Sequence, residues 1–116
     1  MIRRSSERLV ERHEHKFGAE GFITVRNLIL EDRELNGAGR VFAHTTVLPG
    51  SGIGYHIHKN DCEIYYVFSG KGEYNDNGQL TTVEAGDVTF TPSGCGHGIR
   101  CVGDEPLELI ALILYE

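Results

Sequence analysis

The apolar positions of this chain fall in short runs, separated by turn residues, from Phe22 to the C-terminal end. The runs are rich in β-branched and aromatic residues. Short segments of this kind with turn signals between them are typical of an all-β sandwich or barrel. The predicted strands are residues 22–30, 40–48, 53–58, 62–68, 71–75, 79–84, 87–91, 97–102 and 107–115.

The connections between these runs carry recognisable turn signals. Asn77 and Gly78, within the sequence NDNG, suit the type I′ turn of a tight hairpin because both residues accept a positive φ. Residues 31–37, EDRELNG, are predicted to form a single helical turn. Most of the 15 glycines lie between predicted strands, where they permit tight connections.

Residues 1–20 differ from the rest of the chain in composition. Basic and acidic side chains are interleaved there, and few large apolar residues are present to anchor the segment. We expect an N-terminal arm that is partly helical, with His13 and His15 on a solvated face. Residues 21–116 are then the single folded domain.

Two of the predicted strands are apolar on both of their faces. Residues 62–68 place aromatic or branched side chains on both alternations, and residues 107–115 are almost entirely aliphatic. A sheet that is apolar on both faces has to be covered on both. The first strand or a second subunit would supply the outer cover, and we expect a homodimer.

Length, charge and cysteine content limit the partners and the cellular location that we expect for this protein. A length of 116 residues allows one domain, and a net charge of −6 leaves no broad basic surface for nucleic acid. No window approaches the ~20 apolar residues of a membrane span, and the N-terminus lacks the apolar core of a signal peptide. Three cysteines without a CxxC spacing fit reduced thiols. These features predict a cytoplasmic protein that binds neither nucleic acid nor membrane.

The sequence YHIHKNDCE, residues 55–63, places two histidines and a glutamate next to an apolar, β-branched run. His56 and His58 share one face of a strand, whereas Ile53 is expected on the opposite face. After a short turn, hairpin pairing would bring Glu63 beside both imidazoles. Two imidazoles and a carboxylate that converge inside a barrel suit a divalent metal, because an unpaired buried carboxylate is costly. The alternative is a solvent-facing pair of histidines with a separately satisfied glutamate.

A second segment, residues 86–101, favours the metal site over that alternative. A strand there ends in a Pro-Ser-Gly turn, and His97 begins the next strand. A ligand from a distant strand would close the site.

Together the two segments resemble the motifs of the cupin family. The first motif, G-x5-H-x-H-x4-E-x6-G, is matched by Gly50, His56, His58, Glu63 and Gly70. The second, G-x5-P-x-G-x2-H-x3-N, is matched by Gly86, Pro92, Gly94 and His97, with Cys101 in place of the final Asn. Nine of the ten motif positions are therefore in register, and the resemblance spans about residues 38–115. The chain is most similar to the small single-domain members of the RmlC-like cupin superfamily that are described as oxalate-decarboxylase-like.

The resemblance implies a double-stranded β-helix, a jelly-roll barrel with a metal in its mouth. It implies that His56, His58, Glu63 and His97 are the metal ligands. Such a set leaves one or two coordination positions open for a substrate, and it suits Mn²⁺, Fe²⁺, Ni²⁺, Cu²⁺ or Zn²⁺. Cys101 puts in doubt the surroundings of the ligands rather than the ligands themselves, and it is either inert packing or a redox-sensitive neighbour.

Two classes of function are compatible with this site. The first is a metal-dependent enzyme, a dioxygenase, decarboxylase or isomerase that acts on a small oxygenated or carboxylate substrate. Its proton-transfer group would be Tyr65, with His44 and Cys101 behind it. His44 has this role only if it points inward, and the alternative is a hydrogen-bonded residue of the barrel wall. The second is a module that binds a small molecule without turnover. Storage-type cupins are disfavoured because they usually lose the ligands that this chain keeps. The rest of a small apolar pocket would be lined by Val67, Val88, Phe90 and Ile99.

Overall fold

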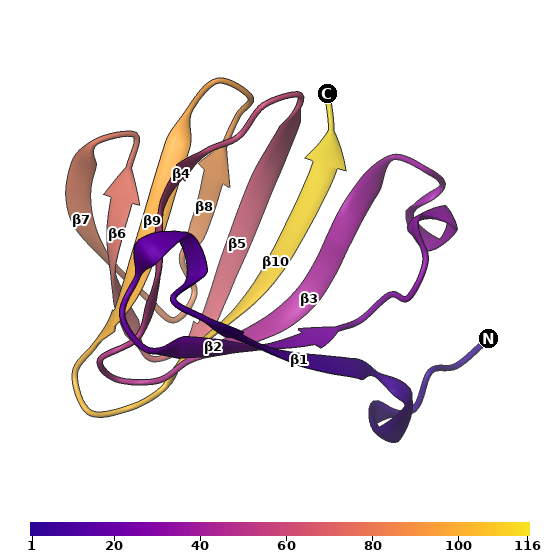
Figure 1. The fold of residues 1–116 in the computed structure, drawn as a ribbon, viewed down its shortest axis with the longest axis horizontal. Coiled ribbons are helices and arrows are strands. Elements are labelled where there is room, and N and C mark those ends of the chain that lie inside the picture. The colour runs from indigo at the N-terminus through magenta and orange to yellow at the C-terminus, as the bar shows by residue number, and fades with distance from the viewer.

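A computed structural model describes all residues, 1–116. The chain forms ten strands and three short 3-10 turns (Figure 1). The strands are β1 (Leu9–Glu14), β2 (Phe22–Asn27), β3 (Gly39–Val47), β4 (Gly52–Ile57), β5 (Asp61–Ser69), β6 (Lys71–Asp76), β7 (Gln79–Glu84), β8 (Val88–Thr91), β9 (Gly96–Val102) and β10 (Leu107–Tyr115). The turns are η1 (Ser5–Glu7), η2 (Lys16–Gly18) and η3 (Asp32–Leu35). None of its helical segments is long and apolar enough to cross a membrane.

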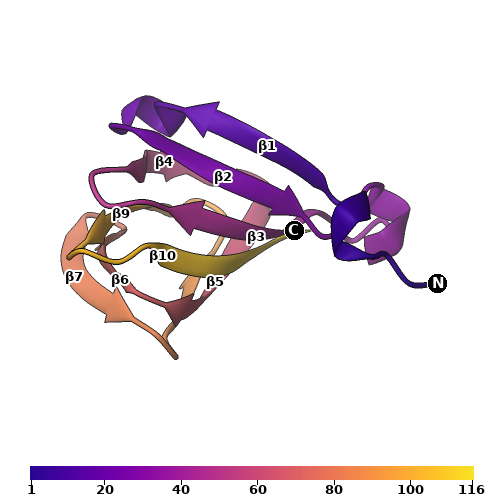
Figure 2. The same ribbon diagram turned by 90° about the horizontal axis from the view of Figure 1, so that it is seen from below.

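The strands form two antiparallel sheets that close around one core. The larger sheet has the order β1-β2-β3-β10-β5-β8, and the smaller has the order β4-β9-β6-β7. Seen from below, the two sheets enclose a common interior, with the β1–β2 pair extending beyond it (Figure 2). The architecture is the double-stranded β-helix that the sequence predicts.

The core follows the alternation of the strands. In β10 the residues Leu107, Leu109, Ala111 and Ile113 point inward and are buried. Strand β10 lies between β3 and β5, so its inward side chains are packed from both sides. Period-2 alternation places these four residues on one face, but β10 is apolar on both faces, so the sequence alone did not show which face is buried.

Strand β8 has the opposite phase to the predicted one. Val88 and Phe90, expected to line the interior, are 64% and 57% exposed, whereas Thr89 and Thr91 are buried. The pairing with β5 sets this phase, because Thr91 lies opposite Glu63 and directly paired residues share a face of the sheet. The interior is therefore more polar at β8 than the apolar pattern indicated.

Strand β4 contains an irregularity that changes the position of Ile53. Ile53 pairs with Ile99 and His56 pairs with His97, so three steps along β4 match two along β9. This bulge turns both Ile53 and His56 toward the interior, and Ile53 is 8% exposed. The expectation that Ile53 and the histidines lie on opposite faces is wrong for this reason.

The N-terminal arm is largely extended rather than helical. Residues Leu9–Glu14 pair with β2 along their whole length, and only η1 and η2 are helical turns. The strand is held by polar contacts: the Asn27 amide donates to Glu11 at 2.7 Å, and the Arg12 guanidinium lies 3.6 Å from the centre of the Phe22 ring. The side chains of β1 are mostly charged, so its sequence has no apolar alternation. The hydrophobic pattern therefore did not predict this strand.

The predicted turns between strands are confirmed. Asn77 and Gly78 have φ values of 51° and 102°, as a type I′ hairpin between β6 and β7 requires. The turn η3 covers residues within the segment expected to be helical. At Gly70, φ is 82° and a Cβ atom would lie 2.3 Å from the Pro106 carbonyl oxygen, so this connection requires glycine.

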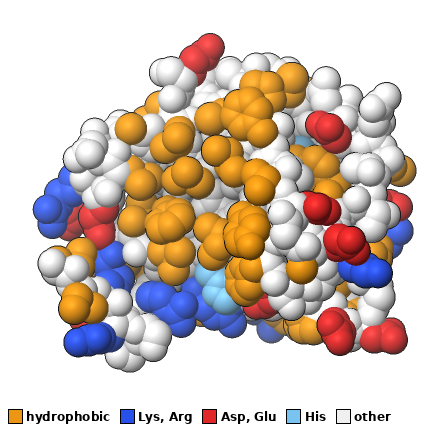
Figure 3. Space-filling model, turned by 180° about the vertical axis from the view of Figure 1, so that it is seen from behind, with side chains coloured by type: hydrophobic (Ala, Val, Ile, Leu, Met, Phe, Trp, Pro, Cys, Tyr) orange, Lys and Arg blue, Asp and Glu red, His pale blue; other side chains and the backbone are white.

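The outer face of the larger sheet is rich in exposed apolar side chains. Tyr66 and Phe68 of β5 and Val88 and Phe90 of β8 are each at least 41% exposed. Figure 3 shows hydrophobic side chains gathered in one broad patch on this side of the molecule. The N-terminal arm does not cover these residues, because β1 and β2 lie at the far edge of the sheet from β8.

Candidate metal centre

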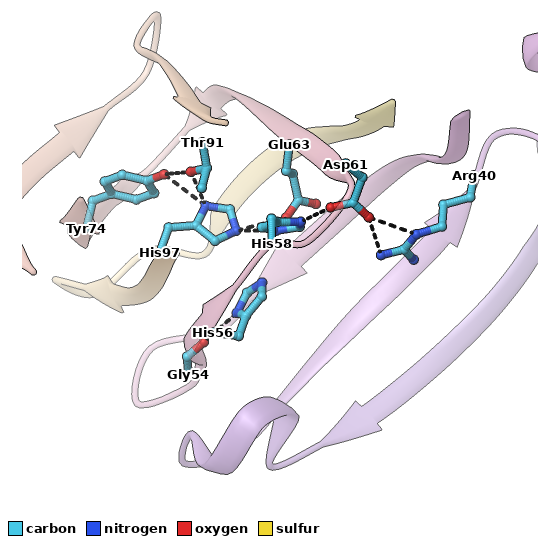
Figure 4. A network of polar contacts seen from close by, with 9 residues as sticks. All are labelled: Arg40, Gly54, His56, His58, Asp61, Glu63, Tyr74, Thr91 and His97. Carbon is cyan, nitrogen blue, oxygen red and sulfur yellow. Dashed lines mark hydrogen bonds and ion pairs between the residues drawn. The ribbon is translucent and has the colours of Figure 1, made fainter. Parts of the chain in front are cut away.

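Four side chains from three separate parts of the chain converge in the barrel. His56 lies on β4, His58 follows that strand, Glu63 lies on β5 and His97 lies on β9 (Figure 4). One donor atom from each lies within 4.8 Å of all the others. The Glu63 Oε1 atom is 3.1 Å from His58 Nε2 and 2.9 Å from His97 Nε2. The structure thus brings together all four residues that the resemblance implied.

Backbone pairing fixes the positions of the three imidazoles. His56 and His97 lie opposite each other in the β4–β9 pair. The His58 backbone is tied to the turn before β9, because its N–H donates to the Cys95 carbonyl and its carbonyl accepts from Gly94 N–H. Gly94 has a φ of 91°, which explains why a glycine occupies this position.

The outer nitrogen of each ring has its own hydrogen-bond partner. The Nδ1 atom of His56 donates to the Gly54 carbonyl at 2.8 Å, and that of His58 lies 2.7 Å from Asp61 Oδ1. His97 Nδ1 lies 2.9 Å from the hydroxyl oxygens of both Tyr74 and Thr91. With Nδ1 as the donor, each ring turns the Nε2 lone pair toward the centre.

Sequence reasoning missed these supporting residues. Asp61 accepts from the Arg40 guanidinium at 3.1 Å as well as contacting His58, so the three form a chain from the rim to the centre (Figure 4). Tyr74 and Thr91 lie on β6 and β8, and only the cross-strand arrangement brings them to His97. The one sequence signal for a supporting residue was that Asp61 lies between His58 and Glu63 along the chain.

The electrostatics of the cluster favour a charged carboxylate. Glu63 is 6% exposed, and burial alone would raise its pKa, but hydrogen bonds to His58 and His97 lower that pKa to about 2. The bond to Glu63 raises the pKa of His58, whereas burial lowers the pKa of His56. The carboxylate therefore remains ionised and needs a cation beside it.

The donor set fits a divalent metal. The Nε2 atoms of His58 and His97 are 3.1 Å apart and both face the Glu63 oxygen. When both rings are neutral with Nδ1 protonated, two lone pairs and a carboxylate oxygen face one another, and only a cation satisfies all three. Three imidazole nitrogens and one carboxylate oxygen are ligands that divalent transition metals accept, so this cluster could hold a metal ion.

Comparison with known proteins gives the family of the chain. The family model described as the cupin domain matches residues 43–113, which include all four clustered residues. The protein is a cupin. An oxalate-binding protein of Thermotoga maritima is 40% identical to this cupin over 114 residues, which are 98% of this chain and 93% of that protein.

Solved structures and a second curated relative agree with this assignment. The crystal structure of a predicted oxalate decarboxylase from T. maritima covers 100% of both chains, with a TM-score of 0.93 and 37% identity. Oxalate decarboxylase OxdC of Bacillus subtilis is 36% identical over 75 residues, which are 60% of this cupin but only 20% of that protein. An RmlC-like cupin from Shewanella frigidimarina, 17% identical with a TM-score of 0.76 over 99% of this chain and 90% of that one, shares the fold.

Three of the four clustered residues of this cupin line a small cavity. Its volume is about 290 Å³, and His56, His58 and Glu63 are in its wall. Aliphatic side chains such as Val25, Val41 and Ile113 form much of the remaining surface, and arm residues close one side. The cavity is at the small end of the range for ligand sites in proteins.

Tyr65 lies at the cavity and beside the cluster. It is 2% exposed, and its ring stacks on His97 with centroids 4.8 Å apart. Burial and the charge of Glu63 raise its pKa well above the ordinary value for tyrosine. The phenol is thus neutral and can donate a hydrogen bond, but it is a poor base.

His44 does not lie at the cavity. It alternates with the buried Ala43 and Thr45, so its side chain is on the outer face of β3. There its Nε2 atom is 2.9 Å from Glu108 Oε2, and its ring packs against Phe68. We therefore do not retain His44 as a proton-transfer group.

Cys101 belongs to the hydrophobic core rather than to the cavity wall. It is 4% exposed, and its Sγ atom donates to the Glu105 carbonyl at 3.1 Å. Burial raises the pKa of its thiol, so the unreactive form is favoured. Inert packing is the alternative that this environment supports.

We expect metal affinity to rise with pH through the range in which His58 titrates. The raised pKa of His58 means that it holds a proton above the ordinary histidine value of about 6.5, and a metal has to displace that proton. The lowered pKa of His56 keeps that ring neutral over the pH range in which His58 titrates. Calorimetric titration with Mn²⁺ between about pH 5.5 and 8.5 should show an increase of up to about tenfold per unit. A pH-independent affinity would contradict this prediction.

The stability of the metal-free fold depends on pH in the opposite sense. Protonated His58 is stabilised by Glu63, so its contribution to stability is complete below the unfolded pKa of about 6.5. That contribution is lost as the pH rises through the raised pKa of the folded state.

Proposed function

We propose that this cupin binds one divalent transition metal through His56, His58, Glu63 and His97 and, with that metal, a small carboxylate such as oxalate. The observation that carries the proposal is the convergence of three Nε2 atoms and a buried carboxylate at a cavity of about 290 Å³. The 40% identical relative named as an oxalate-binding protein supports the choice of ligand.

Each part of the site has a separate task in this function. Gly54, Asp61 and Thr91 hold the outer ring nitrogens, so the imidazoles keep their orientation whether or not a ligand is present. A bound Mn²⁺, Fe²⁺, Ni²⁺, Cu²⁺ or Zn²⁺ would supply positive charge and open coordination positions for carboxylate oxygens. The aliphatic walls exclude water around the ligand, which strengthens these polar contacts.

Turnover is the second candidate function. Partial similarity to oxalate decarboxylase OxdC favours it, and the sequence had suggested a decarboxylase, dioxygenase or isomerase. Such reactions need a group that donates or accepts a proton near the reacting atom. Tyr65 is the proposed group, but its strongly raised pKa limits it to donating. We therefore place ligand binding before catalysis.

One experiment separates the two candidates. Protein stripped with a chelator is loaded in turn with each of the five metals and titrated with oxalate in a calorimeter, while the mixture is assayed for formate, CO₂ and consumed O₂. Saturable binding that requires the metal and leaves oxalate unchanged supports the binding function. Product formation that Tyr65→Phe abolishes supports the enzyme. Oxalate binding that is equal with and without metal would refute the proposal.

We also propose that the protein acts as a homodimer through the outer face of the larger sheet. The exposed patch that includes Tyr66, Phe68, Val88 and Phe90 supports this, because apolar patches of this kind mark contact surfaces. The expected sedimentation mass is twice the chain mass of 12.9 kDa. Phe90→Glu, which introduces charge at a position already 57% exposed, should give a folded monomer. Sedimentation of the native protein at 12.9 kDa at micromolar concentration would contradict the dimer.

A cytoplasmic location remains part of the proposal. Cys62, Cys95 and Cys101 are all free thiols, which is the state expected in a reducing compartment.

A further inference from the structure

We propose that the turn η2 is part of the ligand site: Lys16 binds the outer carboxylate of a small dianion held at the metal centre, and Phe17 covers the ligand-facing side of His56. This inference rests on the proposed function and extends it to the chemical class and charge of the ligand. Both residues lie in the N-terminal arm, outside the two motif segments, and both line the cavity.

The turn is seated on the metal centre rather than projecting from it. The Phe17 ring lies parallel to the His56 imidazole, with centroids 4.0 Å apart and an angle of 13° between the planes. The Phe17 carbonyl lies against Gly54, where a Cβ atom would approach it to 1.9 Å. In Figure 1 the turn (indigo) lies in front of the barrel, on the β4 side. The absence of a side chain at Gly54 therefore lets the arm reach the site.

Its backbone conformation is held by these contacts. Phe17 has a φ of 51°, a value that bulky non-glycine residues seldom adopt. Phe17 is also 55% exposed, so burial of the ring does not account for its position. This arrangement stacks the Phe17 ring on His56 and closes one side of the cavity.

Lys16 is the one cationic side chain of the cavity without a carboxylate partner. Arg40, the other, is paired with Asp61 at 3.1 Å. The Lys16 ammonium instead lies 3.4 Å from the Nδ1 atom of His13 and 5.3 Å from the centre of the Phe17 ring. Glu11, the acidic residue of the same lining, contacts the Asn27 amide at 2.7 Å and His13 at 3.8 Å and forms no ion pair with Lys16. The mouth of the cavity therefore presents an unpaired positive charge.

The distribution of charge indicates the class of ligand. A divalent metal beside one carboxylate leaves net positive charge at the cluster, and Lys16 adds a second positive charge to the cavity wall, which Glu11 also lines. The walls between them are largely aliphatic, and the cavity of about 290 Å³ admits only a small molecule. A short dicarboxylate, with negative charge at both ends, satisfies both positions.

Lys16→Met tests this inference, with oxalate and glycolate as probes. Both compounds can bind a metal through a carboxylate, but only oxalate carries a second negative charge. With metal-loaded protein, we expect the oxalate dissociation constant to rise about tenfold or more and that of glycolate to change less than about threefold, because a charged hydrogen bond is lost only from the dianion. Metal affinity should stay within about twofold of the native value. Lys16→Arg should restore oxalate binding.

Lys59→Met is the matched control, because Lys59 adjoins His58 in sequence but is exposed and does not line the cavity. Phe17→Ala should accelerate the dissociation of both probes, since it opens the cover over His56. Equal oxalate affinities of native protein and Lys16→Met would overturn this inference alone. Native protein that takes up no metal, or no oxalate once loaded, would overturn the proposed function and this inference with it.

Discussion

Replacing Glu63 with glutamine should lower the affinity for Mn²⁺ or Zn²⁺ by about 100-fold or more. Loss of a partner outside the ligand set costs about 10–100-fold in other metal sites, and loss of a charged ligand removes both a bond and a negative charge. The side chain is 6% exposed and its pKa of about 2 keeps it ionised at neutral pH, so the charge is fully present in the native protein. Glutamine preserves the volume but leaves a neutral amide facing His58 and His97. Calorimetric titration of chelator-stripped protein measures the change.

Glu84→Gln is the matched control for this variant. Glu84 is an exposed residue of β7, 3.9 Å from Lys71, and lies outside the metal cluster. Its substitution should leave metal affinity within about twofold, and circular dichroism should show both variants folded. If folded Glu63→Gln bound metal as tightly as Glu84→Gln, Glu63 would not be a ligand.

Leu109→Ala should produce the largest loss of stability among single core changes. Leu109 is 0% exposed at the middle of β10, where its partners are Thr45 on β3 and Val67 on β5. Because strands flank it on both sides, the cavity left behind cannot readily collapse, and the expected loss is about 2–5 kcal/mol. The melting temperature of the metal-free protein should fall by about 10 °C or more. Metal-free samples are needed because metal binding would add stability of its own.

Leu80→Ala provides the comparison for that measurement. Leu80 is the same residue type but is 66% exposed on β7, so its truncation should change stability by no more than about 0.5 kcal/mol. A decrease for Leu109→Ala as small as that for Leu80→Ala would show that β10 is not the packed centre of the barrel.

The sequence predicted the all-β fold and the residues of the metal cluster because both depend on local spacing. Short β-branched runs between turn signals identify the strands, and the i, i+2 spacing of His56 and His58 already implies a shared face. The family motifs then supplied the register of Glu63 and His97. These features can be recognised in the sequence without knowing how the strands pair.

The errors arose where the pairing of strands overrides local pattern. The aromatic side chain of Phe90 favours an interior position, but the register of β8 against β5 turns it outward. The bulge in β4 has no sequence signal other than two glycines, and it reverses the face of Ile53. The phase of His44 could not be settled from the sequence, because both alternations beside it are partly apolar, and its pairing with Glu108 agrees with the alternative of a hydrogen-bonded wall residue.

The arm and the supporting residues lay beyond sequence reasoning for a related reason. Strand β1 is held by backbone pairing, a side-chain hydrogen bond and a cation–π contact rather than by apolar alternation, so its charged sequence indicated a solvated segment. The contacts of Thr91 and Tyr74 with His97 depend on three strands meeting at one point. Contacts of this kind require the full arrangement of both sheets.

Anomalous diffraction from crystals of the metal-loaded protein tests the metal centre most directly. Data collected on either side of the Zn absorption edge locate the ion independently of its coordination. We predict one strong peak per chain, about 2.0–2.2 Å from an Nε2 atom of His56, His58 and His97 and from an oxygen of Glu63. No peak at saturating metal, or a peak bound elsewhere on the chain, would contradict the account.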